Sequence, residues 1–173
     1  MKRCVLGLVC ICIMFLSSPV KADVIDFENI PGADPLDWNN PVPSGYGGLN
    51  WDWVYVLQKD YNPGTGFESG VVSGNWAAYN VWNLESLVTG TTFDFIGAYF
   101  TSAWDTSETL TITGYSSSGI QTATVLINDQ TPTWFQADWT GLDTLSFSTT
   151  GNQFVMDNFT YTPVPLPSTV LLL

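Results

Sequence analysis

The chain has 173 residues, the size of one domain, and carries 16 acidic side chains against 4 basic ones. The formal charge of −12 opposes binding to nucleic acid, and an aromatic content of 14% excludes an intrinsically disordered chain. There is no histidine, and the three cysteines all fall within the first twelve residues, so most catalytic and zinc-binding schemes are excluded as well.

The first 22 residues have the layout of a secretory signal peptide. A basic start at Lys2 and Arg3 precedes an apolar run over residues 4–16, and Val20 and Ala22 place small side chains before the cleavage point. The apolar run is short for a membrane span, which needs about 20 residues. We therefore predict cleavage after Ala22 and export of the chain, with an uncleaved N-terminal anchor as the alternative.

Removal of this segment would leave an acidic body without cysteine. Of the basic side chains only Lys59 would remain, against all 16 acids. Such a surface repels nucleic acid and anionic lipid headgroups and attracts divalent cations. Without disulfides, the stability of the body must come from core packing and from any bound ion.

Alternating apolar and polar residues dominate the sequence from Asp23 onward, and this period of two is typical of half-buried β-strands. Short strands separated by turn residues predict an all-β chain, with an antiparallel β-sandwich of jelly-roll type over residues 23–162. A parallel β-helix is the alternative, although the sequence has no repeat of fixed period. The predicted strands are 24–28, 93–100, a hairpin over 108–127, 133–139, 144–149 and 153–161, and the predicted core includes Phe27, Phe95, Ile112, Leu145 and Phe147.

Other segments depart from simple alternation. Residues 31–48 and 62–74 are rich in glycine and proline, so we expect two long surface loops. Residues 83–88 could form a single helical turn. Large apolar side chains occupy both alternating sets of positions over residues 51–56, which predicts one strand buried on both sides. Its two faces would carry Trp51, Trp53 and Tyr55 on one side and Val54 and Val56 on the other.

Two pairs of oxygen-bearing residues suggest a structural calcium site. Asp26 and Glu28 alternate with Ile25 and Phe27 on the first strand, and Asp157 and Asn158 lie near the end of the last. Calcium binds six to eight oxygens from carboxylates, amides and backbone carbonyls. If the terminal strands are neighbours, we expect Asp26, Glu28, Asp157 and Asn158 to be the ligands. The alternative is that these groups are the solvated face of a strand and an ordinary turn.

Eight tryptophans are more than one small core needs. Trp38 lies in the polar loop over 31–48, between Asp37 and Asn39. A sugar ring stacks on an exposed indole while polar neighbours bind its hydroxyls. We therefore predict carbohydrate binding at Trp38, Asp37 and Asn39, with packing of the indole in or over the core as the alternative.

A pair of carboxylates that cleaves a glycosidic bond is the catalytic scheme that the composition still permits. The four glutamates, Glu28, Glu68, Glu85 and Glu108, form no tight Glu-x-Asp-x-x-Glu pattern. We therefore expect a protein that is not an enzyme, and a glycosidase is the third hypothesis for its function.

The C-terminal residues carry a resemblance to a known family. Residues 163–167 form a proline-rich spacer that cannot pair in a sheet, and an apolar run starts after Pro167. The motif Val164-Pro165-Leu166-Pro167, with the closing strand 154–159, resembles the start of a PEP-CTERM sorting segment in its Val-Pro-Leu-Pro variant. The motif lacks the glutamate of the family name, and neither the membrane helix nor the arginine-rich tail of the family follows it here.

The resemblance implies delivery to the cell surface or extracellular matrix of an exopolysaccharide-producing Gram-negative bacterium, with an exosortase-type enzyme as partner. It also implies that residues 163–173 begin a truncated anchor. We expect the complete gene to encode about 15–20 more apolar residues and then several basic ones, because a span needs that length. Contact with the membrane would come only from that helix. The leading interpretation is thus an exported, non-enzymatic surface or matrix protein, and the alternative is a calcium-assisted carbohydrate-binding module.

Overall fold

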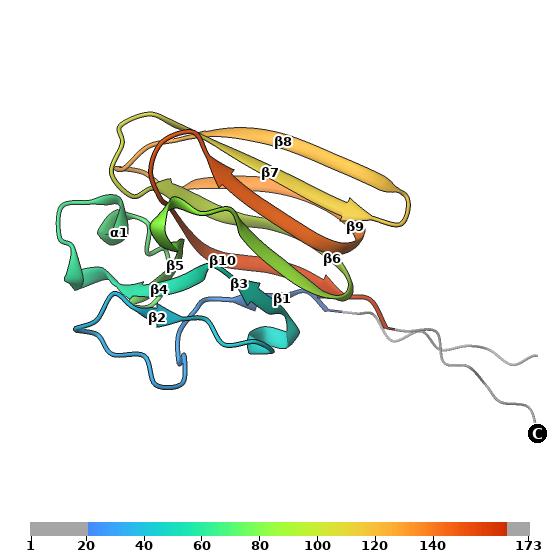
Figure 1. Ribbon diagram of the computed structural model, residues 1–173, viewed down its shortest axis with the longest axis horizontal. Helices are drawn as coiled ribbons and strands as arrows, with labels where there is room; N and C mark the ends of the chain where they lie inside the picture. The colour runs from blue at the N-terminus through green and yellow to red at the C-terminus, as the bar shows by residue number, and fades with distance from the viewer. Residues whose placement is uncertain (1–20, 166–173) are drawn as a thin grey trace, which may run out of the picture.

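The computed structural model describes residues 21–165 and shows an antiparallel β-sandwich of jelly-roll type, which confirms the predicted fold class (Figure 1). The predicted signal peptide falls almost entirely outside the described residues. The strands are β1 (Asp23–Ile25), β2 (Asn40–Pro41), β3 (Asn50–Asp52), β4 (Val54–Gln58), β5 (Trp76–Asn80), β6 (Ser86–Ser102), β7 (Glu108–Ser116), β8 (Gly119–Ile127), β9 (Thr133–Thr149) and β10 (Phe154–Pro163). The short helical elements are α1 (Gly66–Ser69) and the 3-10 turns η1 (Tyr46–Gly48), η2 (Lys59–Tyr61) and η3 (Val81–Asn83). Within residues 21–165, no helix has the length and hydropathy to cross a membrane.

The strands follow the order β2-β4-β5-β10-β6-β9-β7-β8, with β1 added to β10 and β3 added to β6. All of the pairings are antiparallel. In Figure 1, β7 and β8 form part of the upper layer, and β4, β5 and β10 lie below. Antiparallel pairing excludes the parallel β-helix.

Two long strands turn the corner between the layers. In β6 and β9 the pairing shifts between Thr89 and Phe93, between Phe93 and Phe95, and again between Phe95 and Gly97. Such bulges add residues to one strand of a pair and bend it. Gly141, predicted to separate two strands, instead has a positive φ of 68° inside the continuous strand β9. The predicted strands 133–139 and 144–149 are therefore one bent strand.

The main core fills the space between the layers and includes every residue predicted for it. Phe95 is fully buried, stacks on Phe159 at 4.9 Å between ring centroids and meets Phe147 edge-on. Phe27, Ile112 and Leu145 also have no exposed surface. The period-two pattern therefore identified the inward face correctly.

A second, smaller cluster covers the outer face of the β4-β5-β10 sheet. Phe67 of α1 packs there against Tyr79 of β5, edge-on at 5.3 Å. This layer explains why residues 62–74, predicted as a loop, contain a helical turn: Phe67 is its apolar anchor. The cluster consists of Leu57, Phe67, Ala77, Tyr79, Val81, Ala103 and Val155, with Tyr55 and Val71 at its margin.

The prediction of one strand buried on both sides around Trp53 is wrong. Trp53 has a φ of 58° and separates β3 from β4, so the alternation restarts after it. As a result, Trp51 and Val56 both enter the main core, whereas the Trp53 ring is 47% exposed. A left-handed bulky residue is a rare backbone state that alternation cannot reveal.

Three other boundaries differ from the prediction. The first strand ends at Ile25, because Phe27 has a φ of 57°, although both residues are buried as expected. The helical turn expected over 83–88 falls at η3 instead, and residues from Ser86 are already in β6. The 31–48 loop contains the two-residue strand β2 and the turn η1.

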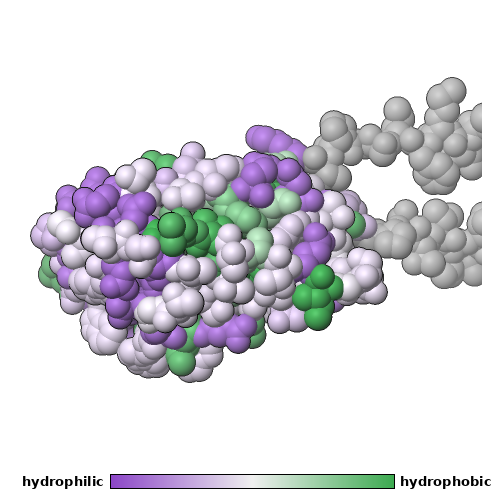
Figure 2. Space-filling view, turned by 90° about the horizontal axis from the view of Figure 1, so that it is seen from above, coloured by the Kyte–Doolittle hydropathy of each residue, from purple (hydrophilic) through white to green (hydrophobic). Residues whose placement is uncertain are grey.

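The strand β8 lies at one end of the sheet order and faces solvent. Figure 2 views the molecule from above Figure 1, from the side of β7 and β8, and shows a group of apolar side chains near the middle of this face with pale and hydrophilic ones around it. Ile120 and Leu126 are exposed on this strand. The threonines of β7 and β8 are typical of such a solvated, pleated face.

Candidate functional site

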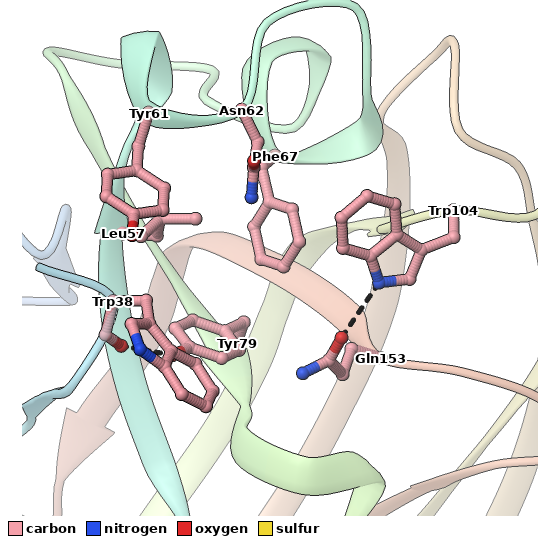
Figure 3. Close-up of a pocket in the computed structure, with 8 residues that line it drawn as sticks. All are labelled: Trp38, Leu57, Tyr61, Asn62, Phe67, Tyr79, Trp104 and Gln153. Atoms are coloured by element: carbon pink, nitrogen blue, oxygen red, sulfur yellow. Dashed lines mark hydrogen bonds between the residues drawn. The ribbon is translucent and has the colours of Figure 1, made fainter.

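A pocket of about 280 Å³ opens on the outer face of the β4-β5-β10 sheet (Figure 3). Three half-exposed rings stand around it: Trp38 is 46% exposed, Tyr61 38% and Trp104 45%. The buried rings of Phe67 and Tyr79 form its base. The complete lining is Trp38, Leu57, Tyr61, Asn62, Phe67, Tyr79, Trp104 and Gln153.

The lining residues come from segments that are far apart in the sequence. Trp38 lies in the loop before β2, and Tyr61 and Asn62 follow β4. Trp104 follows β6, and Gln153 precedes β10. The sheet brings these connections together at the end of the molecule where α1 lies (Figure 1).

Hydrogen bonds fix the orientation of the rings. The Tyr79 hydroxyl donates to the Trp38 carbonyl, and the Trp104 indole N–H donates to Gln153 Oε1 at 2.8 Å, which leaves the Gln153 amide nitrogen directed toward the pocket (Figure 3). Burial raises the pKa of the Tyr79 phenol well above its usual range, so the hydroxyl stays a donor at physiological pH. The buried Asn40 amide donates to the Asp37 carbonyl at 2.6 Å, which holds the loop that carries Trp38.

The residues of the pocket offer stacking and neutral hydrogen bonds. Aromatic faces bind apolar surfaces, and the amides of Asn62 and Gln153 can donate and accept. Aspartate, glutamate, lysine and arginine are all absent from the eight lining residues. This combination suits a neutral, hydroxyl-rich ligand with an apolar face.

The structure separates the three residues predicted to bind carbohydrate. Trp38 lines the pocket, but Asp37 and Asn39 do not. Asp37 Oδ1 accepts the Asn39 N–H at 2.9 Å and closes a turn, and Asn39 faces a neighbouring hollow beside Pro31 and Pro43. The polar flanks of Trp38 therefore shape its loop.

Seven of the eight lining residues were not predicted, among them the exposed or polar ones Tyr61, Asn62, Trp104 and Gln153. Asn62 begins the glycine-rich segment 62–74 and Tyr61 directly precedes it, and the length of that segment was a sign of function. Trp104 and Gln153 carry no local signal, because they meet only when β6 and β10 pair.

The calcium prediction required the terminal strands to be neighbours, and β1 does pair with β10, with Ile25 opposite Phe159. Three of the four predicted ligands, Glu28, Asp157 and Asn158, accept hydrogen bonds from the 72–76 segment. Asp157 Oδ2 accepts the N–H groups of Val72 and Ser73 at 2.7 and 2.8 Å, and Asn158 Oδ1 accepts the Ser73 hydroxyl at 2.7 Å. Glu28 Oε1 accepts two further backbone N–H groups, those of Asn75 and Trp76, at 2.7 and 2.8 Å.

These carboxylates thus attach a loop to the paired terminal strands. Asp26 is exposed and supplies Oδ1 to the Glu28 N–H at 3.2 Å. Over residues 21–165, no group of three or more His, Cys, Asp or Glu side chains has a spacing that could hold a metal ion. Calcium at this rim stays a prediction, tested by melting the protein in millimolar calcium against equal magnesium.

Gly74 lies in the attached loop and shows how tightly it fits. Its φ is +63°, a left-handed state that favours glycine, and an added Cβ would lie 2.3 Å from Glu28 Oε1. The carboxylate can therefore reach the Asn75 and Trp76 N–H groups only because residue 74 has no side chain.

The ionisation of Asp157 should make stability depend on pH. Burial, aided by the nearby Asp26 charge, raises the pKa of this carboxyl from 3.8 to about 6, although the three backbone N–H groups act to lower it. The folded state therefore binds the proton more tightly, and this stabilisation is complete below pH 3.8 and is lost as pH rises to about 6. We expect the Tm of the wild type, relative to Asp157→Asn, to fall over that interval and level off above it. Parallel Tm curves for the two proteins would contradict the assignment.

The glutamates do not assemble a hydrolytic pair in the pocket. Glu108 is buried and accepts the Ser102 hydroxyl at 2.7 Å and the Gly151 N–H at 3.1 Å. Glu68 accepts the Gly64 N–H at 2.6 Å, and Glu85 is exposed next to η3. None of these glutamates lines the pocket, so the geometry of the pocket does not support the hypothesis of a glycosidase.

Comparison with known proteins gives distant likenesses only. No family model and no curated protein matches the chain. Among solved structures, TmCBM61 in complex with β-1,4-galactotriose has 12% identity and a TM-score of 0.41 over 75% of this chain and 98% of its own. The CBM22-1-GH10 modules of Clostridium thermocellum endo-1,4-β-D-xylanase 10B, complexed with xylohexaose, have 12% identity and a TM-score of 0.38 over 69% of this chain and 27% of theirs. The agarase AgWH50C has 9% identity and a TM-score of 0.37 over 79% of this chain and 24% of its own. The chain thus spans about a quarter of the last two. At these TM-scores, no conclusion about ligand or activity follows from the similarities.

Proposed function

We propose that this protein is an exported, non-catalytic β-sandwich that binds a neutral glycan in the pocket around Trp38 and Trp104. The observation that supports the proposal is the lining itself: three half-exposed rings with the amides of Asn62 and Gln153 between them. A sugar offers an apolar ring face and a rim of hydroxyls, and this lining offers a partner for each.

The charge of the chain favours a neutral glycan over an anionic one. Lys21 and Lys59 are the only cations within residues 21–165, and neither lines the pocket. An anionic sugar would find no positive partner there and would approach a chain of formal charge −12.

Binding to a panel of neutral and anionic polysaccharides tests this function. We expect Trp104→Ala to weaken binding of the preferred neutral glycan by roughly tenfold or more, because a stacking face and the orientation of Gln153 are lost together. Isothermal titration calorimetry measures the change. Trp134→Ala is the matched control, since Trp134 is a half-exposed indole on β9 that packs on Tyr99 and does not line the pocket. If the wild type binds no glycan, or if both variants lose affinity equally, the pocket is not the site.

We also propose that the C-terminal motif directs surface sorting by an exosortase-type enzyme. Val164 and Pro165 follow β10, and the Val164 N–H donates to the Thr92 carbonyl at 3.0 Å. Leu166 and Pro167 lie outside the described residues. Support comes from the motif in the sequence, and the test is surface delivery of the complete gene product with and without Pro165→Ala in a host that carries the enzyme. Equal delivery of the two would count against sorting.

A further inference from the structure

A row of aromatic rings continues from the pocket across the outer face of β4 and β5. Tyr79, at the base of the pocket, has Tyr55 beside it at 6.3 Å between ring centroids. Tyr55 in turn meets Trp82 at 6.4 Å, and Trp82 meets Trp53 at 6.1 Å. At the other end, Phe67 joins Tyr79 to Trp104 in two edge-on contacts of 5.3 Å.

The last two rings of this row, Trp53 and Trp82, form what we name the tryptophan platform. Trp53 is 47% exposed and Trp82 57%, so about half of each side chain is accessible to a ligand. Neither residue lines the pocket. Large apolar side chains gathered on a surface usually mark a binding site.

Hydrogen bonds hold the platform in place despite the strained backbone of its two residues. Trp53 and Trp82 have φ values of 58° and 53°, which is unfavourable for a bulky side chain, and the left-handed turn continues through Asn83. The Trp53 carbonyl accepts both the Val81 N–H at 3.2 Å and the Ser86 hydroxyl at 3.0 Å. The Asn83 amide donates to the Gly151 carbonyl. The two rings are thus presented by a braced structure.

The charges near the platform select the class of ligand. Asp52 precedes Trp53 and is exposed, and Glu85 lies three residues after Trp82 and is also exposed. Carboxylates accept hydrogen bonds from hydroxyls and repel anions. Continuity with the pocket then favours the same neutral glycan at both places.

We infer that the tryptophan platform is a second sugar-stacking subsite, so that the protein binds an extended segment of a neutral polysaccharide. This inference rests on the proposed function of the pocket. The Tyr79 to Trp82 part of the row would lie under the middle of the bound chain, with Trp104 and Trp53 near its ends.

Oligosaccharides of increasing length test the inference, using a disaccharide, a tetrasaccharide and a hexasaccharide cut from the neutral polysaccharide that binds the wild type most tightly. Calorimetry should show affinity rising with length. Trp82→Asn and Trp53→Asn remove the rings while keeping a residue that tolerates a positive φ. We expect each variant to lose roughly tenfold in affinity for the hexasaccharide and to stay within about twofold for the disaccharide. Trp134→Ala should change neither.

A measurement on the wild type guards against variants that do not fold. The hexasaccharide should protect tryptophan fluorescence from quenching by acrylamide more than the disaccharide does. If the disaccharide and hexasaccharide bind with equal affinity and protect equally, the platform is not a subsite, although the pocket remains one. If no neutral glycan of any length binds, the proposed function fails and the inference fails with it. Tighter binding of a carboxylated polysaccharide would overturn the assigned ligand class.

Discussion

Replacing Phe95 with alanine is expected to lower the free energy of unfolding by about 3–5 kcal/mol. Phe95 has no exposed surface and lies at the centre of the aromatic core, stacked on Phe159 and edge-on to Phe147 and Trp139. Its removal takes apolar surface from the core and leaves a cavity beside a bulge, where the backbone cannot easily close. Urea denaturation followed by circular dichroism measures the change.

Ile120→Ala is the control for this prediction, because Ile120 is an apolar residue that is 67% exposed on β8. Its substitution should change stability by no more than about 0.5 kcal/mol. A loss below about 1 kcal/mol for Phe95→Ala would mean that the strand register places another residue at the centre of the core.

Gly66→Ala is expected to weaken the proposed glycan binding strongly. Gly66 donates its N–H to the Ala103 carbonyl at 3.0 Å, and an added Cβ would lie 1.7 Å from the Ser102 carbonyl oxygen. Backbone on both sides would have to move, and α1 would carry Phe67 away from Trp104. We expect binding to fall more than roughly tenfold and stability to fall by about 1–3 kcal/mol, the usual cost of overpacking.

Gly64→Ala separates the loss of shape from the loss of stability. A Cβ at Gly64 meets no atom within 4 Å, but its φ of +78° makes alanine strained by about 1–2 kcal/mol. Both variants should therefore be less stable, and only Gly66→Ala should lose the ligand in a titration at low temperature. Retained binding in Gly66→Ala would show that α1 does not position the pocket.

The core could be predicted from sequence because burial on a strand follows a period of two. Phe27, Phe95 and Phe147 each stand in such a pattern and are fully buried. The errors arise where the backbone leaves the extended state for one residue. Trp53 interrupts the strand with a positive φ, and Gly141 bends β9 without ending it. Both the positive φ and the bend depend on which segments pair with these strands, and a local sequence pattern does not contain that information.

The site was predictable only in part, for a related reason. Trp38 was identified because a lone indole in a polar loop has no core to enter. Trp104 and Gln153 were missed because their contact, 2.8 Å between the indole nitrogen and the amide oxygen, joins two connections 49 residues apart. Likewise, the sequence allowed the terminal strands that carry Asp26 and Asp157 to be predicted as neighbours. It did not reveal that Val72 and Ser73, in a distant loop, donate their N–H groups to Asp157.

The two ends of the described chain leave the sandwich together, since Asp23 pairs with Tyr161, and they do so at the opposite end of the molecule from α1 (Figure 1). A protein held by either end would therefore present its aromatic pocket outward. Many copies fixed side by side on one surface would bind a repeating polysaccharide at several points at once. Such multivalent attachment exceeds the affinity of a single pocket by roughly 10²–10⁴ when the spacing fits. A pocket that holds one chain weakly could then make a surface that adheres firmly.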